Sequence, residues 1–549
     1  MNKSLIIVLL FICSSVFAQH TNYHLGKEIN AITEKYLEQT NAHTSFYPLV
    51  KTTINQYINF DSIYNVEFPY SSDNWYKRKV FAEHLIILEG EDFRVTASPI
   101  IHFSKGYERN EKKNTFTNTR GFVIEGDIGN TVSFYSSFAE NQAVFPNYLD
   151  SSIQKSLVVP GQGYARGFKE TGFDYAMSSG YVSVKPAKQF TIQFGHGKHF
   201  VGNGYRSLLL SDNTFNYPYL RLQTNFWKVQ YTNLYAEFQD INYFNTNGID
   251  NYDQMGYAKK YLSSHHLSIN INKKWNLSLY EAIIWRANHA PGSGGFDVNY
   301  LNPIIMFRPV EFSINSPDNA LVGVHTKYKL PFKSYVYGQL ILDEFNIGEM
   351  RSGNNWWGNK YGYQIGAKMH DAIGVENLSL QLEYNLVRPY TYAHYNPMQN
   401  YAHYNQPLAH PLGANFSECL FIAHYRLKRW VARAQIMTAK YGGKIKNNPT
   451  SWGNDVYMST GNYAEIEEVN VSVVGSGRND DFGIEMYQGN LTSLNFVQLN
   501  FAYIVNPKTH LKIDLGIISR TLKNDDGKQE TLLYSCGLKS DLFNQYYDF

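Results

Sequence analysis

The stretch 497-VQLNFAYIVNPKTHLKIDLGI-517 contains two runs in which apolar and polar residues alternate. Apolar side chains occupy every second position from Val497 to Tyr503 and again from Leu511 to Ile517, and Asn506-Pro507-Lys508 separates the runs. An alternation of period two gives a β-strand one apolar and one polar face. Two such strands joined by a short turn fit either a half-buried sheet of a soluble protein or the wall of a membrane barrel.

The same alternation recurs from about residue 93 to the end of the chain. Connections after even-numbered strands are short, as at Pro331-Phe332-Lys333 and Lys428-Arg429, whereas those after odd-numbered strands are long. Outer-membrane barrels keep this order, with tight periplasmic turns and long external loops, so we predict an all-β fold, a transmembrane antiparallel β-barrel of about 18 strands. The expected strands are 93–104, 116–126, 131–140, 177–185, 189–195, 217–224, 227–236, 263–271, 275–285, 321–329, 334–343, 360–370, 376–387, 417–427, 430–440, 493–505, 509–519 and 530–541.

The N-terminal 90 residues differ from the rest of the chain. Lys3, the apolar run Leu5 to Phe17 and the small residue Ala18 form the pattern of a cleaved signal peptide, residues 1–18. Residues 19–90 show a helical period and are expected to form a small periplasmic α-helical segment, with one helix from about Trp75 to Leu88. Residues 91–549 are expected to form the outer-membrane barrel. Its even strand number places both termini in the periplasm and the long loops outside the cell.

Composition narrows the class of protein. Aromatic residues make up 16% of the chain and charged residues 17%, which fits aromatic belts at membrane interfaces or an extended carbohydrate surface. The net charge of +2, together with export, argues against nucleic acid as a partner. Only Cys419 and Cys536 remain after signal cleavage, so a disulfide-stapled fold is excluded. The aromatic terminal residue, Phe549, resembles the assembly signal of bacterial outer-membrane barrels.

The stretch 392-YAHYNPMQNYAHYNQPLAHP-411 repeats Tyr-Ala-His-Tyr-Asn after nine residues. His394, His403 and His410 lack the close spacing of zinc ligands, and no cysteine or carboxylate accompanies them, so we expect no metal site. The chain contains neither G-x-S-x-G nor H-E-x-x-H, so no catalytic residues, no enzyme activity and no cofactor are expected. Histidines hydrogen-bonded within a packed loop are the favoured interpretation of the repeat.

Sugar binding is a further possibility for the external connections, which are rich in aromatic residues and asparagine. Aromatic faces stack on sugar rings, and Asn or His side chains bond to the hydroxyls. The alternative is that tyrosine and asparagine only pack a water-facing lid. The candidate polysaccharide-binding residues are Trp356, Trp357, Tyr392, His394, Tyr395, Tyr401, His403, Tyr404 and Asn405.

A glycine-rich stretch, 195-GHGKHFVGNGYRSLLLSDN-213, matches neither nucleotide-binding pattern. Its glycines suggest sharp turns or close backbone approach, as in a loop tucked into the barrel to plug or narrow it. A ligand-gripping role is the second interpretation. The residues expected in this luminal loop are Gly202, Gly204, Arg206, Ser207, Asp212 and Asn213.

Several motifs resemble a known family. Gly202-Asn203-Gly204, followed by Ser207 to Asn213 and Pro218, is similar to the glycine-then-SLILS-N segment of Wzi-type capsule-assembly outer-membrane proteins. Trp356 to Asn359, His403 to Asn415 and Leu542 to Phe549 more closely resemble the branch of that family known as the gliding motility protein RemB of Bacteroidetes. The resemblance implies an outer-membrane barrel of about 18 strands that holds capsular polysaccharide as a lectin, and a link to gliding.

These observations lead to one expected function and one alternative. The first is a non-enzymatic barrel that binds or anchors surface or capsular polysaccharide through its external loops, supporting capsule or slime attachment and gliding motility. The alternative is a transport pore, or a scaffold of the gliding or secretion machinery. The expected partners are polysaccharide, outer-membrane lipid, and proteins of the gliding or envelope machinery.

Overall fold

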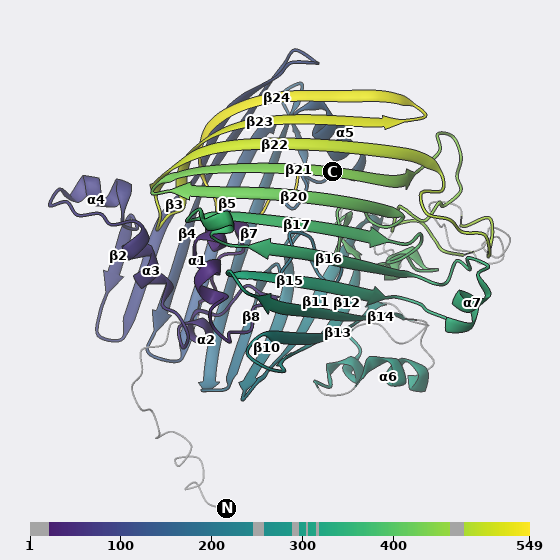
Figure 1. Cartoon of the computed structure of the whole chain (residues 1–549), viewed down its shortest axis with the longest axis horizontal. Helices are drawn as coiled ribbons and strands as arrows, with labels where there is room; N and C mark the ends of the chain where they lie inside the picture. The colour runs from purple at the N-terminus through teal and green to yellow at the C-terminus, as the bar shows by residue number, and fades with distance from the viewer. Residues whose placement is uncertain (1–20, 245–256, 288–295, 304–305, 315–317, 462–476) are drawn as a thin grey trace, which may run out of the picture.

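The computed structural model describes residues 21–244, 257–287, 296–303, 306–314, 318–461 and 477–549. Within these residues, eighteen long strands pair in antiparallel order, and β24 pairs with β3 to close the barrel (Figure 1). Each expected strand corresponds to one of them, so the predicted barrel is confirmed. The predicted signal peptide lies outside the described residues. The strands are β3 (Phe93–Glu108), β4 (Lys113–Ile128), β5 (Val132–Val144), β7 (Gly172–Ala187), β8 (Phe190–Gly197), β10 (Tyr217–Phe226), β11 (Val229–Phe244), β12 (Tyr257–Asn270), β13 (Trp275–Arg286), β14 (Asn319–Leu330), β15 (Ser334–Leu342), β16 (Tyr361–Met369), β17 (Leu378–Val387), β20 (Phe416–Leu427), β21 (Trp430–Gly443), β22 (Asn490–Asn506), β23 (Leu511–Asn524) and β24 (Gly527–Ser540).

The alternation in sequence becomes the two faces of the wall. On β22, Val497, Leu499 and Phe501 are 37%, 49% and 47% exposed and form part of an apolar outer surface. Gln498 and Asn500, between them, face the lumen and line a cavity there. No helix among the described residues is long and apolar enough to cross a membrane.

The two ends of the barrel differ in their connections. The end that carries the turns 188–189, 227–228, 331–333 and 428–429 is called the short-turn end, and the opposite end the long-loop end. Two connections at the long-loop end, 109–112 and 525–526, are tight turns, so the expectation of long loops after every odd-numbered strand was wrong there. The reason is strand length, since β3 and β4 each run for 16 residues and β23 and β24 for 14.

Helices and short strands occupy the connections and the N-terminal segment. The expected helix at Trp75 to Leu88 ends at Phe81, because Ile86 to Glu89 pair with β3 and extend the wall. The helices are α1 (Lys27–Leu37), α2 (Lys51–Ile54), α3 (Phe60–Glu67), α4 (Trp75–Phe81), α5 (Asn147–Ser156), α6 (Phe307–Ile314) and α7 (Ile347–Ser352), with 3₁₀ turns η3 (Val298–Leu301), η4 (Ala372–Gly374) and η5 (Pro397–Gln399). The short strands are β1 (Phe46–Tyr47), β2 (Ile86–Glu89), β6 (Arg166–Phe168), β9 (Phe200–Val201), β18 (Ala402–His403) and β19 (Gln406–Pro407).

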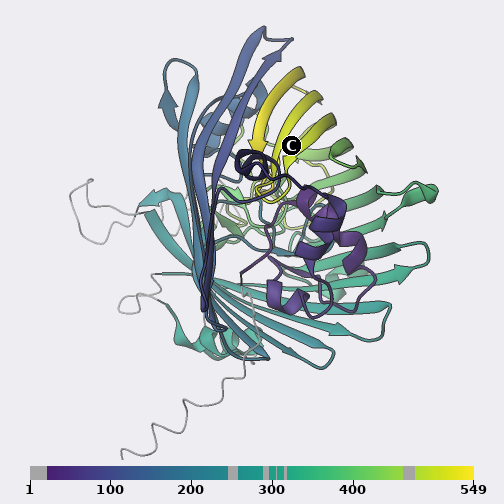
Figure 2. The same ribbon diagram turned by 90° about the vertical axis from the view of Figure 1, so that its left-hand side faces the viewer.

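Part of the N-terminal segment packs inside the wall at the short-turn end, where Figure 2 shows α1 surrounded by strands. By contrast, α4 has no buried residue and stands out from that end. Glutamates on and just after α1 pair with lysines of the inner wall, Glu34 with Lys368 and Glu38 with Lys327. Burial alone would raise the pKa of Glu34, but the charge of Lys368 outweighs it and lowers the pKa to about 2. These pairs fix α1 to β14 and β16.

The C-terminal segment also enters the lumen. β24 ends at Ser540, and residues 541–549 turn back beside α1, where the Asn544 amide donates to the Leu25 carbonyl at 3.0 Å. Phe549 therefore does not end the last strand of the barrel, in contrast to the resemblance noted in the sequence. Its carbonyl instead accepts from the Arg520 side chain at 3.0 Å, on the inner face of β23.

Candidate functional site

Two tyrosines of the repeat, Tyr392 and Tyr401, lie in the lumen and are packed against the glycine-rich loop. Tyr392 and Tyr401 are fully buried, and their rings stack with centroids 5.8 Å apart. The Tyr392 hydroxyl donates to the Leu208 carbonyl at 2.8 Å, and the Tyr401 hydroxyl donates to the Leu209 carbonyl at 2.7 Å. The repeat thus provides two equivalent tyrosines that hold neighbouring peptide groups of one buried loop.

The histidines of the repeat are bonded to nearby groups in the same packed region. His403 accepts from the Gln239 backbone N–H at 3.0 Å, and burial lowers its pKa to about 3. His410 lies 3.0 Å from the Glu418 carboxylate, and burial lowers its pKa as well. Burial likewise lowers the pKa of His394 to about 3. Among the described residues, no group of three or more His, Cys, Asp or Glu side chains is arranged to hold a metal ion.

The glycine-rich loop between β8 and β10 crosses the lumen. Its β9 pairs with β1 of the N-terminal segment, Phe46 opposite Val201. The next residues are anchored on the inner wall, because Glu383 of β17 accepts from the backbone N–H groups of Tyr205 and Arg206 at 2.7 and 3.0 Å. Gly204 has no room for a Cβ, which would lie 2.5 Å from the same carboxylate.

The remaining predicted luminal residues bind the other segments that fill the barrel. Arg206 pairs with Glu418 at 3.0 Å, and the Ser207 hydroxyl donates to the Val201 carbonyl at 2.6 Å. Asp212 accepts from Asn544 and Tyr546 of the C-terminal segment, at 2.7 and 2.8 Å. The Asn213 amide donates to the Pro407 carbonyl at 3.2 Å, and Gly202, at a φ of 128°, donates its N–H to Ser45.

The surface at the long-loop end is formed by a different set of residues. Backbone hydrogen bonds join 354–357 to 481–484, including Trp357 N–H to the Asp481 carbonyl at 2.9 Å. The Arg478 guanidinium lies over the Trp357 ring, 3.9 Å from its centroid. We call residues 345–357 and 478–485 the outer ridge. Its exposed apolar side chains are Phe345, Ile347, Met350 and Phe482, at 41%, 57%, 49% and 52%.

Direct sugar stacking by much of the repeat is contradicted by burial. Tyr392 and Tyr401 have no exposed surface, and His403 and Tyr404 are 2% and 9% exposed, so their rings offer no free face. The reason is that the repeat folds into the lumen instead of over the mouth. The Asn405 amide donates to the Ser156 carbonyl at 2.9 Å. Trp356, Trp357, His394 and Asn405 are half-buried, and Tyr395 is 42% exposed, so these five remain candidates.

Sequence reasoning missed two parts of this arrangement. The segment 478–485 carries no repeat or motif, and only its pairing with 354–357 reveals it as part of the surface. For the C-terminal segment, the sequence suggested only a resemblance of Phe549 to an assembly signal and gave no sign of the luminal packing that the structure shows.

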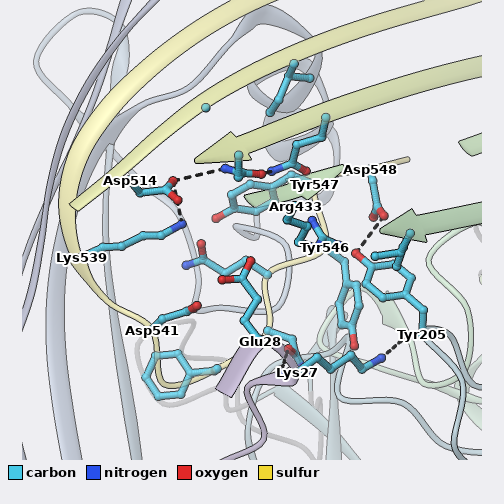
Figure 3. A pocket seen from close by; sticks show the side chains of 18 of the residues that line it. Lys27, Glu28, Tyr205, Arg433, Asp514, Lys539, Asp541, Tyr546, Tyr547 and Asp548 are labelled. Atoms are coloured by element: carbon cyan, nitrogen blue, oxygen red, sulfur yellow. Dashed lines mark hydrogen bonds and ion pairs between the residues drawn. The ribbon is translucent and has the colours of Figure 1, made fainter. Parts of the chain in front are cut away.

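A cavity of about 320 Å³ remains in the lumen near the short-turn end (Figure 3). It lies between α1, the C-terminal segment and the inner wall formed by β20 to β24, β3 and β4. Charged side chains from each of these elements line it, among them Lys27, Glu28, Arg433, Asp514 and Lys539. The molecule therefore has two regions able to contact a ligand, the outer ridge and this luminal cavity.

Comparison with known proteins places the fold. No family model matches the chain, and no curated protein matches it. One similar solved structure is Wzi of Escherichia coli, which is described as an outer-membrane protein involved in Group 1 capsule assembly and as a carbohydrate-binding β-barrel. Its TM-score is 0.53 and its sequence identity 13%, and the match covers 95% of this chain and 100% of that one. OprD of Pseudomonas aeruginosa gives a TM-score of 0.40 and 10% identity, over 84% of this chain and 96% of that one. At these identities the similarity to Wzi shows the outer-membrane barrel fold.

Proposed function

We propose that this protein is a non-enzymatic outer-membrane barrel that binds or anchors surface polysaccharide at its long-loop end. In this proposal the long-loop end faces the cell exterior, and the short-turn end, with both termini, faces the periplasm. The attachment would hold capsule or slime on the cell and support gliding motility, as the resemblance to the RemB branch implies. The Wzi fold, whose solved member is described as carbohydrate-binding, supports the proposal.

The outer ridge is the observation that carries the proposal. Apolar side chains stand out from it beside Asn355, Asn479 and Asp480, all exposed, and this mixture suits sugar rings and their hydroxyls. Backbone hydrogen bonds and the Arg478–Trp357 contact hold the ridge in place, so little order would have to be gained on binding. The filled lumen beneath provides the rigid support.

An open transport pore fits this arrangement less well. The glycine-rich loop, the repeat, α1 and the C-terminal segment all pack within the wall, and many of their largest side chains are fully buried. A scaffold for envelope machinery remains the alternative to polysaccharide binding, and the experiment below separates the two.

The test measures cell-attached and shed polysaccharide in a strain that carries Phe482→Ala and Tyr395→Ala. We expect increased shedding, because both changes remove exposed rings at the long-loop end while the luminal packing stays intact. Tyr57→Ala is the matched control, since Tyr57 is 45% exposed but belongs to the N-terminal segment at the opposite end. Equal amounts of folded barrel in the outer membrane must be confirmed for every strain.

Unchanged retention in the double variant, with normal gliding, would contradict a binding role of the outer ridge. Unchanged retention with lost gliding would favour the scaffold. Deleting residues 392–411 is a poorer test, because the repeat carries buried tyrosines that the luminal packing requires.

A further inference from the structure

One wall of the luminal cavity is a patch of small, inward-facing residues, which we call the floor. The register of β24 with β23 and β3 places these residues in two adjacent rows. The rows are Gly516–Ser535–Gly106 and Asp514–Gly537–Ser104. Five of the six side chains are glycine or serine, so the floor leaves open volume and offers hydroxyl groups that donate and accept hydrogen bonds.

Amide and aromatic side chains surround the floor. Arg433 and Asn500 continue the first row on β21 and β22, since Arg433 pairs with Asn500 and Asn500 with Gly516. Tyr546 and Tyr547 of the C-terminal segment also line the cavity, and Figure 3 labels both together with Arg433. Hydroxyls, an amide and tyrosine rings around one space form a setting suited to a small hydroxylated molecule.

The carboxylates that line the cavity are all paired with cations. Each lies within ion-pair distance of a lysine or arginine of the described chain. The pairs are Glu28–Lys512, Glu34–Lys368, Asp514–Lys539, Asp541–Lys512 and Asp548–Arg206. Each carboxylate of the cavity therefore has a cation beside it, although Lys512 serves both Glu28 and Asp541.

Arg433 differs from these paired cations. Its guanidinium donates to the Gln435 amide oxygen at 2.5 Å and lies 5.8 Å from the Tyr205 ring centroid. No carboxylate of the described residues lies within 4.0 Å of it. A guanidinium presents a planar fork of N–H donors that matches a carboxylate. Lys27, another cation that lines the cavity, likewise bonds to the Gly204 and Tyr205 carbonyls and to no carboxylate of the described residues. Two cations of the cavity therefore lack a carboxylate partner.

We propose that the luminal cavity binds a small hydroxylated carboxylate of the uronic acid class. Its carboxylate would pair with Arg433, and its hydroxyls would bond to Ser104, Ser535 and Asn500. A volume of about 320 Å³ lies at the lower end of the range for small-molecule sites, about 300–1,000 Å³. The site is separate from the outer ridge, so it stands whether or not that surface binds polysaccharide.

The test is equilibrium binding of glucuronate and galacturonate to the purified full-length barrel in detergent. Glucose, with hydroxyls but no carboxylate, and succinate, with carboxylates but no hydroxyls, are the comparison ligands. We expect a uronate to bind more tightly than either. Arg433→Gln should weaken uronate binding about tenfold or more, as expected for a lost charge-assisted hydrogen bond. Ser535→Phe should abolish binding by filling the floor while leaving every charged group.

Matched controls identify the site. Lys440→Gln removes an exposed cation from the same strand as Arg433 and should leave uronate binding unchanged. If Ser535→Phe fails to fold, Ser104→Leu fills the neighbouring position of the floor. Absence of uronate binding, equal binding of glucose or succinate, or wild-type affinity in folded Arg433→Gln would each overturn the proposal. Polysaccharide retention by cells tests the outer ridge separately.

Discussion

Arg206 and Asp548 form an ion pair of 3.0 Å in the lumen, although one belongs to the glycine-rich loop and the other is the penultimate residue of the chain. Their side chains are 1% and 3% exposed. Arg206 pairs at the same time with Glu418 of β20, also at 3.0 Å. The pair therefore joins the luminal loop, the C-terminal segment and the barrel wall into one packed unit.

The first prediction concerns this pair. Arg206→Leu should destabilise the barrel by about 3–5 kcal/mol, because it leaves two buried carboxylates without their shared cation. Urea-induced unfolding of the purified protein in lipid vesicles, followed by tryptophan fluorescence, measures the change.

Asp548→Asn is the matched variant and should cost less, since Arg206 keeps its pair with Glu418. Equal stability of wild type and Arg206→Leu would show that the luminal loop folds independently of the wall.

The second prediction concerns the repeat. Tyr401→Phe removes a hydroxyl that donates to the Leu209 carbonyl and lies 2.7 Å from the Tyr280 hydroxyl. Loss of a buried hydrogen bond of this kind costs about 1–3 kcal/mol, measurable in the same urea titration. Tyr395→Phe is the control, because Tyr395 is 42% exposed. A similar loss in both variants would contradict a specific packing role for Tyr401.

The wall was predictable because its pattern is local. The alternation of apolar and polar residues, as from Val497 to Tyr503, indicates which side chains of a strand face outward and which face inward. Short turns such as Lys428-Arg429 indicate which strands are neighbours. The strand ends were predicted less well. Residues 105–108 of β3 continue the ladder into the first hairpin with few large apolar side chains to mark them.

The content of the lumen was not predictable from such patterns. Tyr392 and Tyr401 look alike in sequence whether they face sugar, lipid or other protein, because tyrosine suits all three surroundings. In the structure their hydroxyls donate to the Leu208 and Leu209 carbonyls, which are nearly two hundred residues away in the sequence. That the Arg433 guanidinium has no carboxylate partner among the described residues likewise becomes visible only when the partners of the surrounding carboxylates are known.

The third prediction is a pH dependence of the contact between α1 and the wall. The pKa of Glu34 is about 2 in the folded protein, below its ordinary value of 4.5, because Lys368 outweighs the effect of burial. The pair thus contributes stability that is fully present above about pH 4.5 and is lost as pH falls toward 2. Glu34→Gln should remove that contribution, about 3 kcal/mol for a pKa that falls from 4.5 to about 2.

The measurement is the difference in unfolding free energy between wild type and Glu34→Gln at several pH values from 2 to 7. We expect the difference to shrink below about pH 4.5, where the wild-type carboxylate takes up its proton. Glu91→Gln, at an exposed position just before β3, serves as the control. A difference that is constant across the range would show that the Glu34–Lys368 pair does not titrate as the structure requires.

The fourth prediction is that the wild-type barrel shows no steady ion conductance in planar bilayers, because loops and both terminal segments fill its lumen. A variant that lacks most of the glycine-rich loop should conduct. Gly197 and Tyr217 already pair across β8 and β10, so a two-residue Asn-Gly turn can replace residues 198–216 without disturbing the wall. The replacement removes Arg206 and the β9 pairing with β1, and so frees both the C-terminal and N-terminal segments from the loop.

Folded insertion must be shown for both proteins, since an unfolded variant would perturb the bilayer nonspecifically. Discrete, voltage-independent current steps in the variant alone would establish that the glycine-rich loop closes the barrel. Steady conductance of the wild type would instead favour the pore, because an aqueous path would then have to run past the buried Arg206 pairs. If the variant does not conduct, α1 and the repeat close the lumen without the glycine-rich loop. The residues that block the barrel would then be Tyr392 and Tyr401 and not Arg206.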